Sequence, residues 1–195
     1  MRIEHEKPLG PDRLPFDAYQ MAREKYTVDP VTGGLNRAGF FEEANKTIRS
    51  SKHPENLAVI VLDLNRFKQL NDTRGHTVGD LALRGTEDFL GEELRQSDIY
   101  GHTRGRTGGD EFVLLVDLTP RKEPKQTNEE RLTALLRRLN SRYPEVMREK
   151  SELFSNLSMS AGGAHYQAGQ PLEETIKLAD ERMYQNKHAA GEDSR

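Results

Sequence analysis

The segment Leu57 to Leu64, with the sequence LAVIVLDL, constrains the fold more than any other part of the chain. A nearly continuous apolar run of this length predicts a strand that is buried on both faces, so other elements must cover the sheet on both sides. The exception within the run is Asp63, which stands close to its end. A carboxylate in such a place is costly unless it is paired or binds a metal ion, although it could also serve only as a cap at the strand end.

The spacing of apolar residues predicts the order of elements around this strand. Helical spacing predicts helices near residues 78–94, 132–143 and 171–188, and short apolar runs predict strands near residues 98–104, 111–117 and 153–165. From residue 55 onward the order is therefore β-α-β-β-α-β-α. This order indicates an α/β (α+β) fold with a ferredoxin-like βαββαβ core, in which an antiparallel central sheet is flanked by helices.

The chain upstream of the strand divides into an arm and a helix. Residues 1–15 contain three prolines and are expected to be irregular, and residues 16–26 can form a short helix. A turn-rich segment, DPVTGGLNR, follows at residues 29–37, and helical spacing resumes near residues 40–48. We expect an N-terminal arm at residues 1–26, one folded domain at residues 27–190 and a short tail at residues 191–195.

Composition excludes several classes of protein. The absence of cysteine excludes disulfides, thiolate metal sites and cysteine nucleophiles, and it fits a cytoplasmic location. No apolar run reaches the roughly 18 residues needed to span a bilayer, and the N-terminus lacks the apolar segment of a signal peptide. The formal net charge of -3 provides no basic field for nucleic acid, so we expect neither a nucleic-acid partner nor a membrane segment.

Two acidic motifs can form one metal site. In Thr107-Gly-Gly-Asp-Glu-Phe112, two glycines between strand-like runs favour a tight type I′ hairpin, since both central positions of that turn need positive φ. Asp110 and Glu111 would then lie at the hairpin tip, where an acidic turn without further function is the alternative. If this strand and the strand of Asp63 are neighbours, the carboxylates can share a hard cation such as Mg²⁺, which prefers oxygen ligands.

A third polar motif follows Asp63, at residues 71–80 with the sequence NDTRGHTVGD. Asn71 offers a donor and an acceptor, and Asp80 offers two acceptor oxygens. Guanine presents N1–H and N2–H₂ donors beside acceptors, so these two side chains can read it. The alternative is that Asn71 shapes a turn and Asp80 stabilises the start of the next helix.

These motifs, in this order, resemble the GGDEF domain of the diguanylate cyclase family over roughly residues 27–190. The matching segments are DPVTGGLNR, LDLNRFKQLNDTRGHTVGD, TGGDEF, and SMSAGGA followed by ADERMYQNK. The resemblance implies a fold like that of the nucleotidyl cyclases and the polymerase palm. It also implies synthesis of cyclic di-GMP from two GTP molecules, with release of pyrophosphate.

The resemblance assigns a role to each matching residue. Two Mg²⁺ or Mn²⁺ ions per active site would be bound by Asp63, the carbonyl of Leu64, Asp110 and Glu111. Asp63 and Asp110 would be catalytic through these ions, and Glu111 would in addition activate the 3′-hydroxyl. Asn71 and Asp80 would bind guanine, and Lys68, Lys187 and backbone amides near Phe67 would bind phosphate. Gly108 and Gly109 would let the protein backbone approach the nucleotide closely.

The implied reaction also predicts partners. Each domain holds one GTP, so two domains must meet in a homodimer, at least transiently, and the attack of a 3′-oxygen on an α-phosphate must occur twice. Many family members bind their own product at an Arg-x-x-Asp motif, and Arg95 and Asp98 match it, although both can equally mark a helix end. The stretch from Ile99 to Arg106 is longer than is usual in the family, and its extra residues could break the link between product binding and inhibition.

Three alternatives to an active cyclase stay open. The chain can be a degenerate domain that binds GTP or cyclic di-GMP as a receptor, a cyclase that makes an adenine-containing product, or a dimerisation module. Asn65, which stands where the family often has a second aspartate, favours degeneracy, whereas the intact Gly108 to Glu111 motif argues against it.

Overall fold

A computed structural model describes residues 26–96, 101–120, 126–189 and 191 of the chain. Its centre is a four-stranded sheet with the order β2-β3-β1-β4, in which each neighbouring pair is antiparallel. The strands are β1 (Leu57–Asn65), β2 (Gly101–Arg106), β3 (Glu111–Asp117) and β4 (Ser158–His165). The predicted antiparallel sheet, with its flanking helices, is confirmed.

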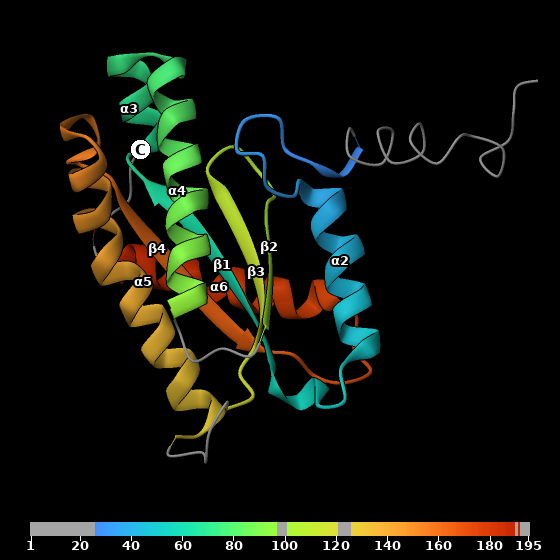
Figure 1. The fold of residues 1–195 in the computed structure, drawn as a ribbon. Helices are drawn as coiled ribbons and strands as arrows, with labels where there is room; N and C mark the ends of the chain where they lie inside the picture. Colours follow the sequence, from blue (N-terminus) through green and yellow to red (C-terminus); the bar gives the residue numbers. More distant parts are fainter. Residues whose placement is uncertain (1–25, 97–100, 121–125, 190, 192–195) are drawn as a thin grey trace, which may run out of the picture.

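Helices cover both faces of this sheet (Figure 1). The helices are α2 (Arg37–Ser50), α3 (Phe67–Arg74), α4 (His76–Gln96), α5 (Asn128–Lys150) and α6 (Leu172–Ala189), with short 3₁₀ turns at Pro54–Asn56 and Glu152–Phe154. The alternation of side chains along β1 divides the core in two. Leu62 and Leu64 belong to the cluster under α4 and α5, and Val59 and Val61 belong to the cluster under α2 and α6.

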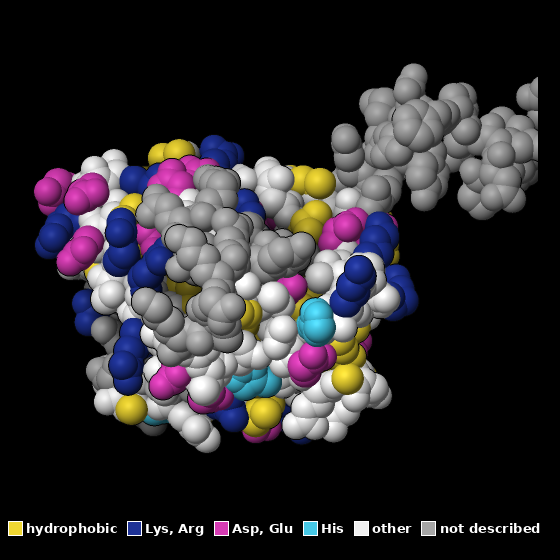
Figure 2. Space-filling view, turned by 60° about the horizontal axis from the view of Figure 1, so that its bottom comes forward, with side chains coloured by type: hydrophobic (Ala, Val, Ile, Leu, Met, Phe, Trp, Pro, Cys, Tyr) yellow, Lys and Arg dark blue, Asp and Glu magenta, His cyan; other side chains and the backbone are white. Residues whose placement is uncertain are grey.

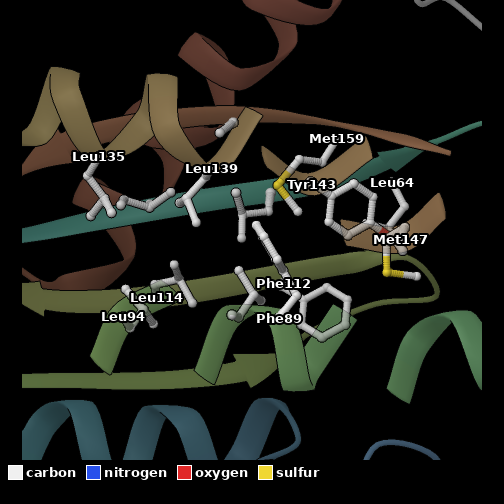
Figure 3. Packing of buried hydrophobic residues seen from close by; sticks show 14 of the residues in the cluster. Leu64, Phe89, Leu94, Phe112, Leu114, Leu135, Leu139, Tyr143, Met147 and Met159 are labelled. Carbon is white, nitrogen blue, oxygen red and sulfur yellow. The ribbon is translucent and has the colours of Figure 1, made fainter. Parts of the chain in front are cut away.

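The cluster under α4 and α5 explains why the sequence of β1 is almost entirely apolar. Leu135, Leu139 and Tyr143 project from α5 toward the sheet, where they meet Phe112 and Leu114 of β3 (Figure 3). The opposite face of β1 is equally covered, so both alternating sets of side chains are apolar. A fully buried leucine in such a place stabilises a fold by about 2–5 kcal/mol relative to alanine.

Local signals fix the ends of several helices. Asn36 accepts a hydrogen bond from the amide of Gly39 and caps α2. Thr127 and Glu130 form a reciprocal capping box at the start of α5, which supplies partners to amides that have none inside the helix. These side chains explain why the predicted helices near residues 40–48 and 132–143 form where they do.

Three sequence-based expectations need correction. The spacing of apolar residues predicts no helix between β1 and residue 78, but residues 67–74 form a separate helix, α3. The strand expected at residues 153–165 begins only at residue 158, because residues 152–154 form a 3₁₀ turn. The strand expected at residues 98–104 is observed at residues 101–106, and residues 97–100 lie outside the described part.

Residues 1–25 of the predicted arm and residues 192–195 of the predicted tail also lie outside the described residues. Among the helices of the described ranges, none is both long enough and apolar enough to cross a bilayer. On the face seen in Figure 2, side chains of both charges are interspersed and hydrophobic side chains form small separate groups.

Candidate active site

Asp63, Asp110 and Glu111 are brought together by the pairing of β1 with β3. Asp63 lies directly opposite Glu111 in the antiparallel register, and the amide of Leu64 donates to the carbonyl of Asp110 over 3.2 Å. The two strands are therefore neighbours, which is the condition under which their carboxylates can share a cation. Because side chains opposite each other share a face, Asp63 and Glu111 lie on the side of the sheet that α2 and α6 cover.

The hairpin between β2 and β3 carries two of these carboxylates. The amide of Thr107 donates to the carbonyl of Glu111 over 3.0 Å and closes the loop. Neither Gly108 nor Gly109 has a positive φ, so the expected type I′ turn is wrong. A Cβ at Gly108 would lie 2.7 Å from Glu111 Oε2, so a larger residue there would displace the end of this carboxylate side chain. A Cβ at Gly109 would meet no described atom beyond its chain neighbours within 4 Å, so this side of the loop is open to a ligand.

Arg106, for which the sequence predicted no role, holds this loop. Its Nε and Nη2 donate to the carbonyl of Gly109 over 3.1 and 2.9 Å, and its Nη1 donates to Asp29 Oδ2 over 2.8 Å. Asp29 also accepts from the amides of Val31 and Thr32. One guanidinium therefore joins the turn of the upstream motif to the acidic hairpin, and this side chain sets the loop backbone. An arginine two residues before a Gly pair was the available signal.

Burial and neighbouring carboxylates raise the pKa of Asp110 and of Glu111. Burial raises the pKa of Asp110, and the nearby Asp63 raises it further. Burial likewise raises the pKa of Glu111, with added contributions from Asp63 and Asp110. The positive charge of Lys187 opposes this effect at Asp110. The cluster therefore favours the arrival of further positive charge.

A hard divalent cation fits the chemistry of these donors. Mg²⁺ is usually bound through one or two carboxylates plus substrate phosphates, and Asp63, Asp110 and the carbonyl of Leu64 supply oxygen atoms of this kind. However, no three His, Cys, Asp or Glu side chains of the described residues are grouped so that they could hold an ion by themselves. The donor set is therefore incomplete without oxygen atoms from a ligand.

Lys187, in the last turn of α6, reaches this cluster from the far end of the sequence. Its Nζ lies 2.5 Å from Asp63 Oδ1, and the side chains of the two residues are only 20% and 14% exposed. The lysine that the resemblance assigns to phosphate contact is therefore located at the candidate metal ligand.

Asn71 and Asp80 lie on two successive helices. Asn71 is inside α3, so the alternative that it shapes a turn is wrong, and the turn occurs at Gly75, whose φ is 85°. The Oδ1 atom of Asn71 is buried without a hydrogen-bond partner among the described residues. A side chain at Gly79 would collide with this oxygen. Asp80 is half-buried in α4, beyond its first turn, where a helix-start role is weak.

The start of α3 presents backbone amides next to the end of β1. Arg66 has a left-handed backbone, with φ 64° and ψ 14°, and no side chain caps the helix. Phe67 is buried in the core and fixes this end, whereas Lys68 is exposed. Unpaired amides and the helix dipole make such a terminus suitable for a phosphate group.

Asn65 has a structural environment of its own. Its side chain is buried, and Nδ2 donates to Ser158 Oγ over 3.0 Å and to Ser160 Oγ over 3.1 Å. The amide therefore joins the end of β1 to β4. The residue that departs from the family pattern is satisfied by the neighbouring strand.

The predicted product-inhibition pair falls at the limit of the described residues. Arg95 lies in the helical backbone of α4, without a described side chain, and Asp98 lies outside the described residues. Their role stays a prediction.

A cavity of about 320 Å³ lies beside Glu111. Val61 and Val113 of the sheet line it, together with Arg37 of α2 and Lys177 of α6. Among the described residues predicted for the site, Glu111 alone lines this cavity. The cavity is therefore separate from the region of Asn71 and Asp80.

The sheet and its carboxylate-bearing hairpin are those of a GGDEF cyclase domain. The chain belongs to the family described as "Diguanylate cyclase, GGDEF domain", whose model matches residues 26–193.

Curated relatives agree with this assignment. Diguanylate cyclase DgcP of Pseudomonas aeruginosa is 32% identical over 96% of this chain, and diguanylate cyclase DgcZ of Escherichia coli is 31% identical over 82% of it. A third relative, cyclic di-GMP phosphodiesterase NbdA of Pseudomonas aeruginosa, is 31% identical over 87% of the chain. The alignments span only 26%, 50% and 20% of these relatives, respectively.

Solved structures share the fold. The coiled coil and GGDEF domain of DgcB from Caulobacter crescentus, in complex with c-di-GMP, matches with a TM-score of 0.66 and 24% identity, over 89% of this chain and 86% of that one. Diguanylate cyclase SiaD of Pseudomonas aeruginosa, in complex with its activator SiaC, matches with a TM-score of 0.60 and 28% identity, over 89% of this chain and 62% of that one.

Proposed function

We propose that the chain is a diguanylate cyclase that condenses two GTP molecules into cyclic di-GMP and releases pyrophosphate. The observation that carries this proposal is the partly buried carboxylate cluster of Asp63, Asp110 and Glu111 on β1 and β3. It lies beside the open helix start of α3, which suits phosphate. Asn71 Oδ1, buried and without a partner among the described residues, is a polar group that a guanine edge can satisfy.

In this proposal Asn71 and Asp80 select the base. A carboxylate at Asp80 attracts the N1–H and N2–H₂ donors of guanine, whereas adenine presents an acceptor at N1. A site built around such a match rejects the wrong base because its buried polar groups would then stay unpaired. The phosphates would lie against the amides near Phe67 and against Lys68 and Lys187.

The chemical step is an in-line displacement. The 3′-oxygen of one GTP loses its proton to Glu111, forms a bond to the α-phosphorus of the other GTP, and the bond to the bridging oxygen of the leaving pyrophosphate breaks. The raised pKa of Glu111 makes its carboxylate a stronger proton acceptor than an ordinary glutamate. Divalent ions, Mg²⁺ or Mn²⁺, when bound by Asp63, Leu64 and Asp110, would stabilise the attacking and leaving oxygens.

The same proposal requires two chains. One domain presents one nucleotide, so a second domain must face it across a two-fold axis and the displacement must occur once in each direction. Specific activity should therefore rise with enzyme concentration until the dimer is saturated.

A second candidate function is a receptor for cyclic di-GMP. The observation that favours it is that a relative named as a cyclic di-GMP phosphodiesterase shares 31% identity over 175 residues, so close relatives of this domain occur in proteins of a different named activity. The replacement of an aspartate by Asn65 agrees with this alternative.

One experiment separates the two. The purified chain is incubated with GTP and Mg²⁺, with ATP and Mg²⁺ as the matched control, and the products are identified by mass spectrometry. We expect cyclic di-GMP from GTP and no corresponding product from ATP. Unchanged GTP, together with micromolar or tighter binding of cyclic di-GMP, would replace the cyclase by the receptor.

A further inference from the structure

Lys187 and Asp63 each have two possible partners. In the structure they pair with one another over 2.5 Å, and both side chains are largely shielded from water. In the proposed function Asp63 ligates a metal ion and Lys187 contacts the triphosphate. The Oδ1 atom of Asp63 cannot give its full charge to a metal ion while the ammonium remains at this distance.

We infer that Lys187 acts as the counter-ion of Asp63 until a nucleotide arrives, and thereby makes binding of the divalent metal depend on the nucleotide. This inference rests on the proposed function, because it takes Asp63 as a metal ligand and the triphosphate as the later partner of Lys187. It assigns Lys187 a positioning role in the order of binding, in addition to any contact with phosphate.

The charges around the cluster explain why Lys187 is suited to this role. Its positive charge also opposes the raised pKa of Asp110, so it compensates more than one carboxylate. Arg106, which acts on Asp110 as well, is held by Asp29 and by the carbonyl of Gly109. A flexible lysine can change partners more readily than an arginine that is held at both ends of its guanidinium.

A metal ion that arrives alone meets an unfavourable exchange. It must displace Lys187 from Asp63, which leaves a shielded ammonium without a partner, and such a group is costly. It also finds an incomplete set of ligands, because no three His, Cys, Asp or Glu side chains in the described ranges form a metal site.

A metal ion that arrives with a nucleotide meets neither cost. The phosphates supply the missing oxygen ligands and accept the ammonium of Lys187. Each ligand therefore increases the affinity of the other by the same factor, as linkage requires.

The test measures Mn²⁺ affinity by electron paramagnetic resonance on the full chain, without nucleotide and with the α,β-methylene analogue of GTP, which cannot release pyrophosphate. For the wild type we expect weak binding of Mn²⁺ alone and tight binding with the analogue. For Lys187→Met we expect Mn²⁺ alone to bind about tenfold more tightly, and the coupling between Mn²⁺ and the analogue to fall by a similar factor, within the range of about 5–150-fold typical of coupled sites.

Two variants serve as matched controls. Lys187→Arg keeps the charge and should retain the weak binding of Mn²⁺ alone. Lys177→Met removes the same charge from the same helix at an exposed position beside Glu111, and it should change Mn²⁺ affinity by no more than about twofold, as expected of an exposed charge. If circular dichroism shows that the Lys187→Met protein is unfolded, Lys187→Gln takes its place in the experiment.

The outcomes separate this inference from the proposed function. Equal Mn²⁺ affinity in the wild type and Lys187→Met, or an equal gain in Lys177→Met, overturns the inference and leaves the cyclase assignment intact. Absence of Mn²⁺ binding to the wild type, with and without the analogue, overturns the metal ligands of the proposed function and this inference with them.

Discussion

Glu93 lies on the face of the sheet that α4 and α5 cover, whereas Asp63 and Glu111 of the candidate active site lie on the opposite face. Glu93, on α4, has a side chain only 3% exposed and pairs with Arg138 Nε over 2.6 Å and with Arg142 Nε over 3.0 Å, both on α5. One carboxylate thus meets two guanidinium groups. The active-site cluster brings three carboxylates together, and Lys187 pairs with one of them.

The difference teaches how to separate structural from functional charge in this domain. A buried ion that is fully paired holds two elements together, and its removal leaves unpaired charge behind. The cluster on β1 and β3 is under-compensated, which is unfavourable for the free protein and favourable for a cationic ligand. Charge balance, rather than burial, distinguishes the two.

Glu87 shows that a raised pKa alone does not mark a functional site. Burial raises the pKa of this α4 residue although Arg104 lies 2.9 Å away and opposes the shift. Glu87 lies against Gly34 of the upstream turn, where a Cβ would lie 2.6 Å from its Oε1. Arg104 pairs with this carboxylate, and the nearby Asp88 and Asp29 contribute less to its raised pKa than burial does, which agrees with a role in packing.

The comparison is tested most strongly by Asp110→Asn. Removal of a proposed metal ligand should lower GTP turnover by at least about a hundredfold, since even groups that only orient metal ligands contribute 10–100-fold. The free energy of unfolding should stay equal or rise, because one repelling charge is lost. The rate of cyclic di-GMP formation measures the first effect, and chemical denaturation measures the second. Wild-type turnover in a folded Asp110→Asn protein would contradict the metal assignment.

Base selection extends the comparison to neutral polar groups. Asp80→Asn exchanges acceptor oxygens for an amide at the proposed guanine edge. The preference for GTP over ATP should fall by about 1–3 kcal/mol, the value of a well-placed pair of hydrogen bonds to a base. Competition between the two nucleotides, followed by mass analysis of products, measures it. A preference unchanged from the wild type would remove Asp80 from the guanine site.

The substitution Arg138→Met tests the fully paired carboxylate, Glu93. The free energy of unfolding should fall by about 2 kcal/mol, less than the 3–5 kcal/mol of a fully broken buried pair because Arg142 remains beside Glu93. GTP turnover in the folded protein should not change. Arg137→Met, at an exposed neighbouring position, is the control and should leave stability unaltered. Equal losses in the two variants would show that Glu93 is not the cause.

The smallest expected effect is a dependence of stability on pH. The pKa of Asp110 is raised in the folded state, so its contribution to stability is complete below the unfolded pKa and is lost as the pH rises through the folded pKa. The stability gained by Asp110→Asn over the wild type should therefore be larger at about pH 7 than at about pH 4.5. Thermal unfolding of both proteins at the two pH values measures it. A gain that shrinks with rising pH would reverse the assigned direction.

Local patterns in the sequence were sufficient for most of the fold. The apolar run at Leu57 to Leu64 and the helical spacing at residues 132–143 and 171–188 predicted elements that are observed, because burial of one face imposes its own period. Helix α3 was missed since only Phe67 and Leu70 of its eight residues are buried. So short a helix depends on packing rather than on its own propensity.

The acidic residues and the Gly pair could be named from the sequence, but their electrostatic state could not. The pairing of Arg106 with Asp29 joins residues 77 positions apart, and that of Lys187 with Asp63 joins residues 124 positions apart. The energy of two charges depends on their distance and on the polarity between them. Only the register of β1 with β3 and the position of α6 determine those quantities, so the tertiary structure decided which carboxylates are compensated and which are left for a ligand.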